Sequence, residues 1–194
     1  TTFFSNASQT TGTLNGGGGA YFNADSLILG GLFDRNRATA DGGGVYALAG
    51  VSISGTRFVS NGAAGNGGGL NERGFTAGSA ITITQAQFIG NRAMDGGGIW
   101  TRNTSSNRLV NVLLAGNRAG IAGQALYAAH NGGDDTLTIL HTTIATPTLT
   151  GGAAVVVEDG TTIISNTIIV NHATGIQRSG GTVTQDYNLF FGNT

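Results

Sequence analysis

The feature that most constrains this chain is a repeat, in which an apolar residue is followed three positions later by Asn along most of the 194 residues. The pairs are Phe3/Asn6, Phe33/Asn36, Phe58/Asn61, Phe88/Asn91, Leu114/Asn117, Ile168/Asn171 and Phe190/Asn193. Ile144 fits the same series, with Pro147 in the Asn place. The apolar anchors lie 22 to 30 residues apart, which predicts a repeat architecture of about eight coils.

A second motif keeps step with the first, because a run of three glycines follows each of the early anchors. The triplets occupy positions 17–19, 42–44, 67–69 and 96–98. Later coils carry weaker versions, Gly123-Gln124-Ala125 and Gly151-Gly152. Glycine is required where the backbone turns sharply or where a neighbouring segment leaves no room for a Cβ atom, so the triplets predict tight, crowded corners.

Short runs before the anchors alternate apolar and small polar residues, which is typical of β-strands with one buried face. Examples are Val51-Ser52-Ile53, Ile81-Thr82-Ile83 and Leu137-Thr138-Ile139. No segment predicts a long helix. Coils of 22 to 30 residues are also too short for propeller blades, which have about 40. The sequence therefore predicts an all-β fold, a single-stranded right-handed parallel β-helix (a β-solenoid), as one domain over residues 1–194.

Equivalent residues of successive coils stack about 4.8 Å apart in such a solenoid. We expect the anchors to form a ladder inside it, made of Phe33, Phe58, Phe88, Leu114 and Ile144. A second ladder is expected at a turn, made of Asn36, Asn61, Asn91 and Asn117. Asn tolerates left-handed backbone, and its amide can form hydrogen bonds to the coils on either side.

Composition excludes several classes of function. Only 10% of the residues are charged, the nine basic residues are all Arg, and the formal net charge is −1. A nucleic-acid partner is therefore not expected, because such binding depends on a basic surface. The absence of Cys excludes disulfide frameworks and thiolate metal sites. No apolar run approaches the roughly 20 residues of a membrane span, so we expect an extracellular or cell-surface chain.

Insertions in a solenoid commonly mark the surface that binds partners. Three consecutive coils carry inserts after the strand that follows the Gly triplet, at positions 71–79, 101–107 and 128–135. Stacked on one another, these inserts predict a contact flank along one corner. Its candidate residues are Glu72, Arg73, Phe75, Arg102, His130, Asp134 and Asp135.

The second residue after the Gly triplet is aromatic in four coils of five. This row, the stripe, consists of Tyr21, Tyr46, Asn71, Trp100 and Tyr127. Strand alternation turns the stripe outward if its neighbours Val45, Ile99 and Leu126 point inward, so exposed aromatic rings are expected. Such rings can stack on sugars or pack against another protein. They can equally cover one another between coils, and the sequence leaves both interpretations open.

Two acidic residues directly precede Gly triplets. Asp41 lies four residues after Arg37, and Asp95 lies three residues after Arg92. Stacked carboxylates suit Ca²⁺, which takes six to eight oxygen ligands, but two coils would separate these acids by roughly 10 Å. We therefore expect a local Arg–Asp ion pair in each turn, and we predict no metal site and no cofactor.

Catalysis is not expected, although parallel β-helices also host enzymes that cleave polysaccharides. That chemistry needs paired carboxylates about 5 to 10 Å apart, or a base beside an acid-bound metal ion. The acids here are few, and the three His residues lie in different coils without an evident acidic partner. No catalytic residue is assigned. Cleavage through Glu72, Asp134 or Asp135 stays open as a further alternative.

The pairing of Phe-x-x-Asn with Gly-Gly-Gly-(Val/Leu/Ile) resembles the repeat of chlamydial polymorphic outer membrane proteins and of related bacterial secreted proteins with right-handed parallel β-helix passenger domains. The resemblance covers residues 3 to about 126, and the ending at 186–193 is similar to late coils of the secreted group. It implies surface display, adhesion or extracellular structure. It carries no shared catalytic residues.

Together these features predict a non-catalytic extracellular module with a structural or adhesive role. The chain begins and ends inside a repeat, so we expect uncapped ends, either in a fragment or in a filament subunit that self-associates end to end. Other surface proteins and glycans are the alternative partners. A carbohydrate-binding module that uses Tyr46, Trp100 and Tyr127 is the second expected function.

Overall fold

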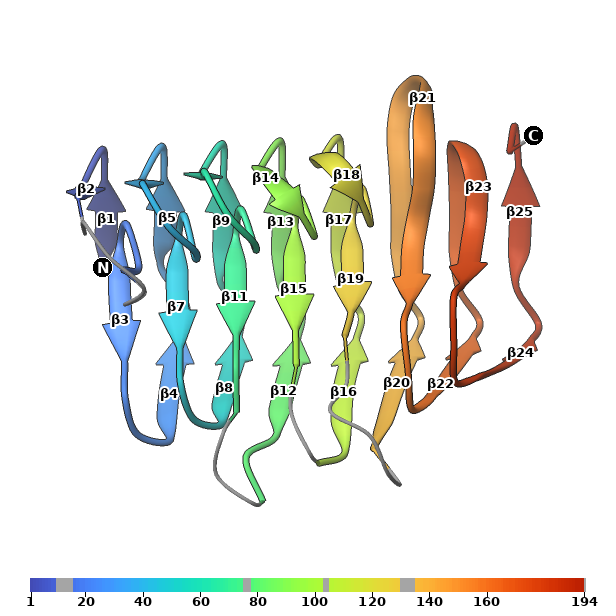
Figure 1. Cartoon of the computed structure of the whole chain (residues 1–194), viewed down its shortest axis with the longest axis horizontal. Coiled ribbons are helices and arrows are strands. Elements are labelled where there is room, and N and C mark those ends of the chain that lie inside the picture. The colour runs from blue at the N-terminus through green and yellow to red at the C-terminus, as the bar shows by residue number, and fades with distance from the viewer. Residues whose placement is uncertain (10–15, 75–77, 103–104, 130–134, 194) are drawn as a thin grey trace.

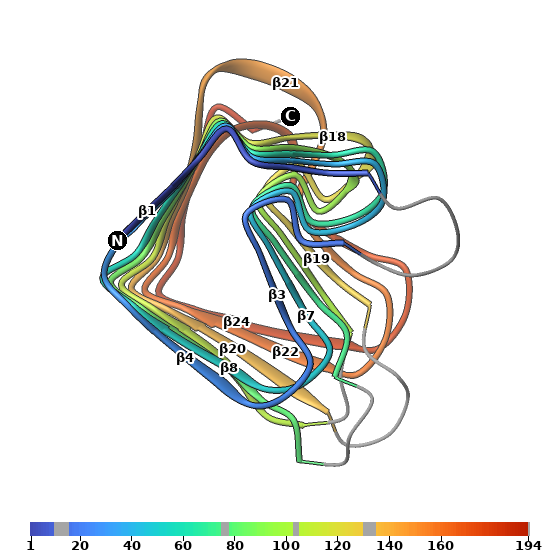
Figure 2. The same ribbon diagram turned by 90° about the vertical axis from the view of Figure 1, so that its left-hand side faces the viewer.

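The computed structural model describes residues 1–9, 16–74, 78–102, 105–129 and 135–193, and this part of the chain contains β-strands and no helix. The strands wind into a β-solenoid whose coils lie side by side along one axis (Figure 1). All strand pairs between the described residues are parallel. Seen from its N-terminal end, the chain turns clockwise as it recedes, so the solenoid is right-handed (Figure 2). The predicted fold class is confirmed.

Each coil passes through four strand positions, which we name as faces. The anchor face comprises β1 (Thr2–Phe4), β5 (Leu32–Asp34), β9 (Arg57–Val59), β13 (Gln87–Ile89), β17 (Leu113–Ala115) and β25 (Leu189–Phe191). The short face comprises β2 (Ala7–Ser8), β6 (Arg37–Ala38), β10 (Gly62–Ala63), β14 (Arg92–Asp95) and β18 (Arg118–Ala122). The stripe face comprises β3 (Ala20–Phe22), β7 (Val45–Ala47), β11 (Leu70–Glu72), β15 (Ile99–Thr101) and β19 (Leu126–Ala128).

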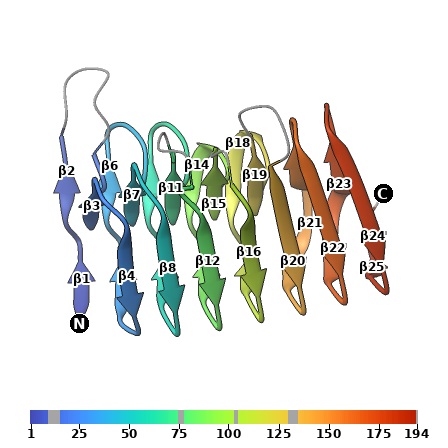
Figure 3. The same cartoon turned by 90° about the horizontal axis from the view of Figure 1, so that it is seen from below.

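The fourth face, the base, lies in a row in Figure 3 and comprises β4 (Ser26–Leu29), β8 (Val51–Ser54), β12 (Ile81–Thr84), β16 (Asn107–Val110), β20 (Thr136–Leu140), β22 (Thr161–Ser165) and β24 (Thr182–Asp186). Two long strands, β21 (Thr143–Val157) and β23 (Ile168–Arg178), begin on the anchor face and end on the stripe face. The solenoid has about six turns, slightly fewer than the eight coils expected.

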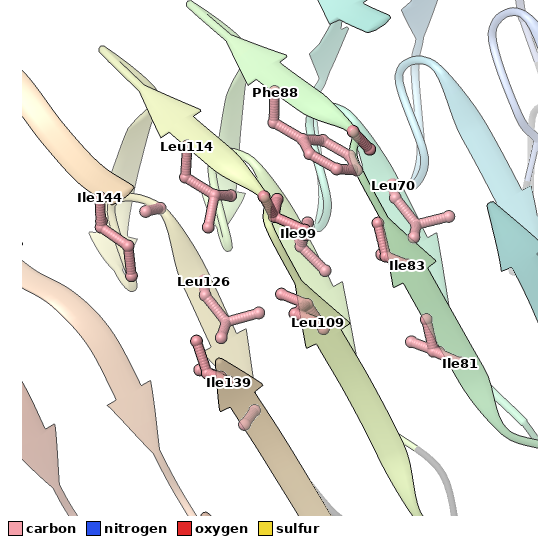
Figure 4. Close-up of a cluster of buried hydrophobic side chains, with 14 of the residues drawn as sticks. Leu70, Ile81, Ile83, Phe88, Ile99, Leu109, Leu114, Leu126, Ile139 and Ile144 are labelled. Carbon is pink, nitrogen blue, oxygen red and sulfur yellow. The ribbon is translucent and has the colours of Figure 1, made fainter. Parts of the chain in front are cut away.

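The interior is the expected ladder of anchors. Four phenylalanine rings stack nearly parallel, with successive centroids 4.5, 5.0 and 4.5 Å apart, namely Phe3, Phe33, Phe58 and Phe88. Leu114 and Ile144 continue this ladder, and Ile83, Leu109 and Ile139 of the base contribute to the same buried cluster (Figure 4). Stacked aromatic pairs add about 0.5 to 1.5 kcal/mol each beyond the burial of their surface.

One anchor was predicted one residue too early. The sheet register pairs Ile144 with Ile169, which is fully buried, whereas Ile168 is 40% exposed. The motif was misleading here because Asn171 stands three residues after Ile168. The residue that occupies the Asn position in this coil is His172.

The Asn residues form the second expected ladder, and four of them are buried, namely Asn36, Asn61, Asn91 and Asn117. At each step the Oδ1 atom of one Asn accepts two hydrogen bonds from the Asn one coil earlier, from its backbone N–H and from its amide. Between Asn61 and Asn91 these distances are 2.9 and 3.0 Å. The Nδ2 atom of Asn91 also donates to the carbonyl of Phe58 at 2.9 Å. The buried amides are therefore satisfied from coil to coil.

The left-handed backbone lies one residue before the Asn and not, as expected, at the Asn itself. Ser5, Arg35 and Ser60 have φ angles of 52°, 55° and 54°, and glycines at 90 and 116 take this place in later coils. The preceding residue makes the corner, so the Asn can direct its N–H along the solenoid axis to the next coil.

Each glycine of a triplet is required for a different reason, as positions 67–69 show. Gly67 has a φ of 67°, which disfavours any residue with a Cβ atom. A Cβ on Gly68 would clash with the carbonyl oxygen of Gly97 in the next coil, and one on Gly69 would lie 2.7 Å from the ring of Phe88. The predicted crowded corner is therefore confirmed.

Beyond β18 the short face ends, and β21 bows outward at this corner (Figure 2). Here His172 takes the ladder position, and its N–H donates to the Oδ1 atom of Asn193 at 2.9 Å, as a ladder Asn would. The His172 side chain is 1% exposed, and neither ring nitrogen has a hydrogen-bond partner among the described residues. Burial lowers the pKa of His172 to about 4.

Replacing Phe88 by Asp should unfold the solenoid, because an unpaired carboxylate in this core costs several kcal/mol. Phe88→Leu is the matched control, since Leu114 occupies the equivalent place one coil later, and we expect it to fold with a modest fall in Tm. Thermal unfolding followed by circular dichroism checks both. An Asp variant with an unchanged Tm would contradict the inward ladder.

His172 should make the fold less stable in mild acid. Its folded pKa of about 4 lies below the ordinary value of 6.5, so the unfolded chain binds this proton more readily. The stability is present above pH 6.5 and is lost as the pH falls toward 4. His172→Asn, which restores the ladder residue, should remove this part of the pH dependence of Tm. Parallel losses of stability in both proteins would show that His172 is not the cause.

Candidate functional site

The stripe is a row of outward side chains on the stripe face. Strands β3, β7, β11, β15 and β19 pair without a register shift, which aligns Tyr21, Tyr46, Asn71, Trp100 and Tyr127. Their inward neighbours Val45, Ile99 and Leu126 are fully buried, as predicted. The prediction of exposure is wrong for most of the row, because Tyr21 is 46% exposed but Tyr46 and Trp100 are only 0% and 6% exposed.

Two kinds of contact bury the stripe. The rings of Tyr21 and Tyr46 stack with centroids 5.7 Å apart, so neighbouring coils cover one another. Arg73, just beyond β11, lies with its guanidinium carbon 5.6 Å from the centre of the Trp100 ring. Its Nη1 atom is 3.6 Å from the Oδ2 atom of Asp41. Arg73 therefore bridges the coils on either side of its own, and the mutual-cover interpretation fits this geometry.

The middle of the stripe is electrostatically unusual. Burial raises the pKa of Tyr46 to about 12, although the positive charge of Arg73 works in the opposite direction. Asn71, between Tyr46 and Trp100 in the register, is fully buried. Among the described residues neither amide atom of Asn71 has a hydrogen-bond partner. A buried amide in this state is costly to the fold.

A second cluster lies at the other end of the stripe and was not anticipated. Burial, with a contribution from the Glu158 carboxylate, raises the pKa of Tyr127 to about 12. Burial also raises the pKa of Asp95, against the effect of a hydrogen bond from the Ala122 N–H, and Glu158 adds to the rise. Glu158 follows β21, far along the chain, so local sequence gave no signal for this group of acids around Tyr127.

The predicted Arg–Asp pairs within the turns are wrong. The Oδ1 atom of Asp41 accepts a hydrogen bond from the N–H of Asn66 at 2.7 Å, and Asp95 accepts one from the N–H of Ala122 at 3.0 Å. Each acid therefore binds the following coil, directly before the glycine corner of that coil. Arg37 and Arg92 point outward from the short face instead, and both are exposed.

The inserts leave the solenoid in a row, since the strands before and after them are stacked in register. Arg102 is exposed on this flank, whereas Glu72 is fully buried and accepts a hydrogen bond from the Thr101 hydroxyl at 3.0 Å. Asp135 is buried as well. Phe75, His130 and Asp134 lie outside the described residues. Within the described ranges no three His, Asp or Glu side chains gather as metal ligands would.

Comparison with known proteins adds no family to this picture, since no family model, curated protein or solved structure matches the chain. None of the described residues forms a helix long and apolar enough to span a membrane.

Removing the Arg73 side chain should uncover Trp100, the single Trp of the protein. We expect Arg73→Ala to shift the fluorescence emission to longer wavelength and to increase quenching by acrylamide, because water then reaches the indole ring. Arg102→Ala, which removes an exposed Arg of the same flank, is the control and should leave the spectrum as it is. Equal spectra for all three proteins would mean that Arg73 does not cover Trp100.

Proposed function

We propose that this protein is a non-catalytic extracellular β-solenoid with a structural or adhesive role, a stiff rod that presents its lateral surface to other surface proteins or to glycans. The observation that supports this proposal is the use of the repeated side chains. In the inner coils the recurring Phe, Asn and Gly residues are buried, and they join or make room for neighbouring coils. The repeated residues therefore make the solenoid long and stiff.

A stiff solenoid holds its surface groups at regular distances. The stripe-face strands pair without a shift, so the points at which the inserts leave the solenoid are spaced about 4.8 Å per coil. Regular spacing favours multivalent attachment, in which several weak contacts act together and exceed the affinity of each. This property supports an adhesive role at the surface of a cell.

Beads coated with the purified protein test the proposal. We expect the beads to adhere to surfaces coated with cell-surface glycans or proteins, and to release no new reducing ends or unsaturated sugars from a panel of polysaccharides. Beads coated with the heat-denatured protein are the control. Loss of all adhesion, or degradation of a polysaccharide, would overturn the proposal. Negative-stain images of the same sample distinguish single rods from fibres in which copies stack head to tail, the structural form of this role.

A carbohydrate-binding module is the second candidate, and Asn71 is the observation that favours it. The Asn71 amide offers a donor and an acceptor, which can both bind sugar hydroxyls, and Trp100 beside it offers a ring for stacking. A sugar can reach both only if Arg73 moves away. Titration of neutral oligosaccharides against Trp100 fluorescence, in the wild type and in Arg73→Ala, tests this candidate. Unchanged emission in both proteins would exclude it.

A further inference from the structure

The short face carries a row of arginines on its outward side. Strand pairing places Arg37, Gly62, Arg92 and Arg118 at equivalent positions of β6, β10, β14 and β18. All three Arg side chains are exposed. Three steps between strands separate the first from the last, about 14 Å along the solenoid axis. One third of the basic residues of a chain with a net charge of −1 is thus aligned on a narrow face.

No acidic side chain of the described residues neutralises this row. In the part of the chain that the structure describes, Arg35 pairs with Asp34 and Arg73 pairs with Asp41. Neither ion pair involves the row. The nearest candidates by sequence, Asp41 and Asp95, bind backbone N–H groups of the following coils. Arg92 and Arg118 lie directly opposite each other on neighbouring strands, where like charges are destabilising. An anion bound to the row would relieve this repulsion.

The row also borders a groove. A groove of about 790 Å³ lies over β2, β6 and β10, with Arg37 and Arg92 among the residues that line it. At its centre a Cβ atom on Gly62 would meet nothing within 4 Å, so the space between the two arginines is open. Arg118 lines a second hollow of about 340 Å³ toward β21. No acidic residue lines either hollow as the structure describes them.

We propose that this groove and the hollow beside Arg118 together bind a linear anionic polysaccharide, whose sulfate or carboxylate groups pair with Arg37, Arg92 and Arg118. The guanidinium group is a planar fork of donors that matches either anion with two parallel hydrogen bonds. The length of the row selects a polymer, because one small anion cannot contact all three guanidinium groups across about 14 Å. The small residues Gly62, Ala38 and Ala63 on the groove lining leave room for sugar rings.

Charge favours a polysaccharide over a nucleic acid as the polymer. Nucleic-acid binding depends on neutralising many phosphates from a broad basic surface, whereas this chain has no Lys and a net charge of −1. A single row of three arginines fits a single strand of widely spaced charges. The inferred site specifies which class of glycan the protein binds in its adhesive role, and it therefore rests on the proposed function.

Binding in solution tests the site. The probes are fluorescent oligosaccharides of heparin, which is sulfated, and of polygalacturonate, which is carboxylated, with dextran as the neutral control and a DNA duplex as the competing polyanion. We expect one or both anionic glycans to bind, with an affinity that falls as salt rises, and dextran not to bind. The triple variant Arg37→Gln, Arg92→Gln and Arg118→Gln should bind at least tenfold more weakly.

A matched control keeps the charge change and moves it away from the row. The triple variant Arg57→Gln, Arg108→Gln and Arg178→Gln removes three exposed arginines from other faces, and its affinity should stay within twofold of the wild type. Both triple variants should melt no lower than a few degrees below the wild type, because none of these guanidinium groups has an acidic partner among the described residues.

Gly62 gives the sharpest pair of variants, since the equivalent positions on β6 and β14 already carry Arg side chains. Gly62→Arg completes the row and should tighten binding, whereas Gly62→Glu places a carboxylate between Arg37 and Arg92 and should weaken it. Three results would each overturn the proposal. They are equal affinity of the wild type and the triple variant at Arg37, Arg92 and Arg118, no binding of either anionic glycan, and tighter binding of DNA than of the glycans. Because the oligosaccharides bind free protein, beads that fail to adhere would count against the proposed function and not against this site.

Discussion

The rest of this structure depends on hydrogen bonds that run parallel to the solenoid axis, and the buried Asn ladder concentrates them. The Oδ1 atom of Asn91 accepts hydrogen bonds from Asn61 of the preceding coil. Its Nδ2 atom donates to Asn117 of the following coil and to the Phe58 carbonyl of the preceding coil, so one side chain serves two interfaces. The third glycine packs on this ladder in three of the four triplets, and a Cβ on Gly98 would lie 3.2 Å from the Cγ atom of Asn117. The two sequence motifs keep step because one is packed against the other.

Charged residues are few, and Asp41 shows how much one of them can do. Asp41 binds the next coil through Asn66 and also binds Arg73, which in turn covers Trp100. One carboxylate therefore links the Gly corner, the stripe and the insert flank. The arginines of the short face stand apart from this network. Arg73 has an acidic partner, whereas Arg37, Arg92 and Arg118 have none among the described residues.

The features that repeat could be predicted from the sequence, whereas the contacts between side chains of different coils could not. Phe58, Asn91 and the Gly triplets were predicted correctly because stacking forces equivalent residues into equivalent environments. The burial of Trp100 could not be predicted, since it depends on Arg73 from another coil and on a contact within the insert flank. The short face escaped notice because Arg37 and Arg92 each had a plausible acidic neighbour in sequence, and only the hydrogen bonds of those acids show that they are already engaged.

The short face and the Asn ladder both stop before β21, and this has a mechanical consequence. Force applied along the axis is carried by the same hydrogen bonds from coil to coil, so the solenoid extends at its weakest interface first. The Asn ladder runs from Asn6 to Asn117, and the short face ends with β18. Past that point the corner is crossed by β21 and β23, whose register shifts there, and by a His that shares a single ladder bond. Under tension we expect the coils to separate first past Asn117, where the amide ladder is missing, which leaves an N-terminal segment that still carries the stripe and the arginine row.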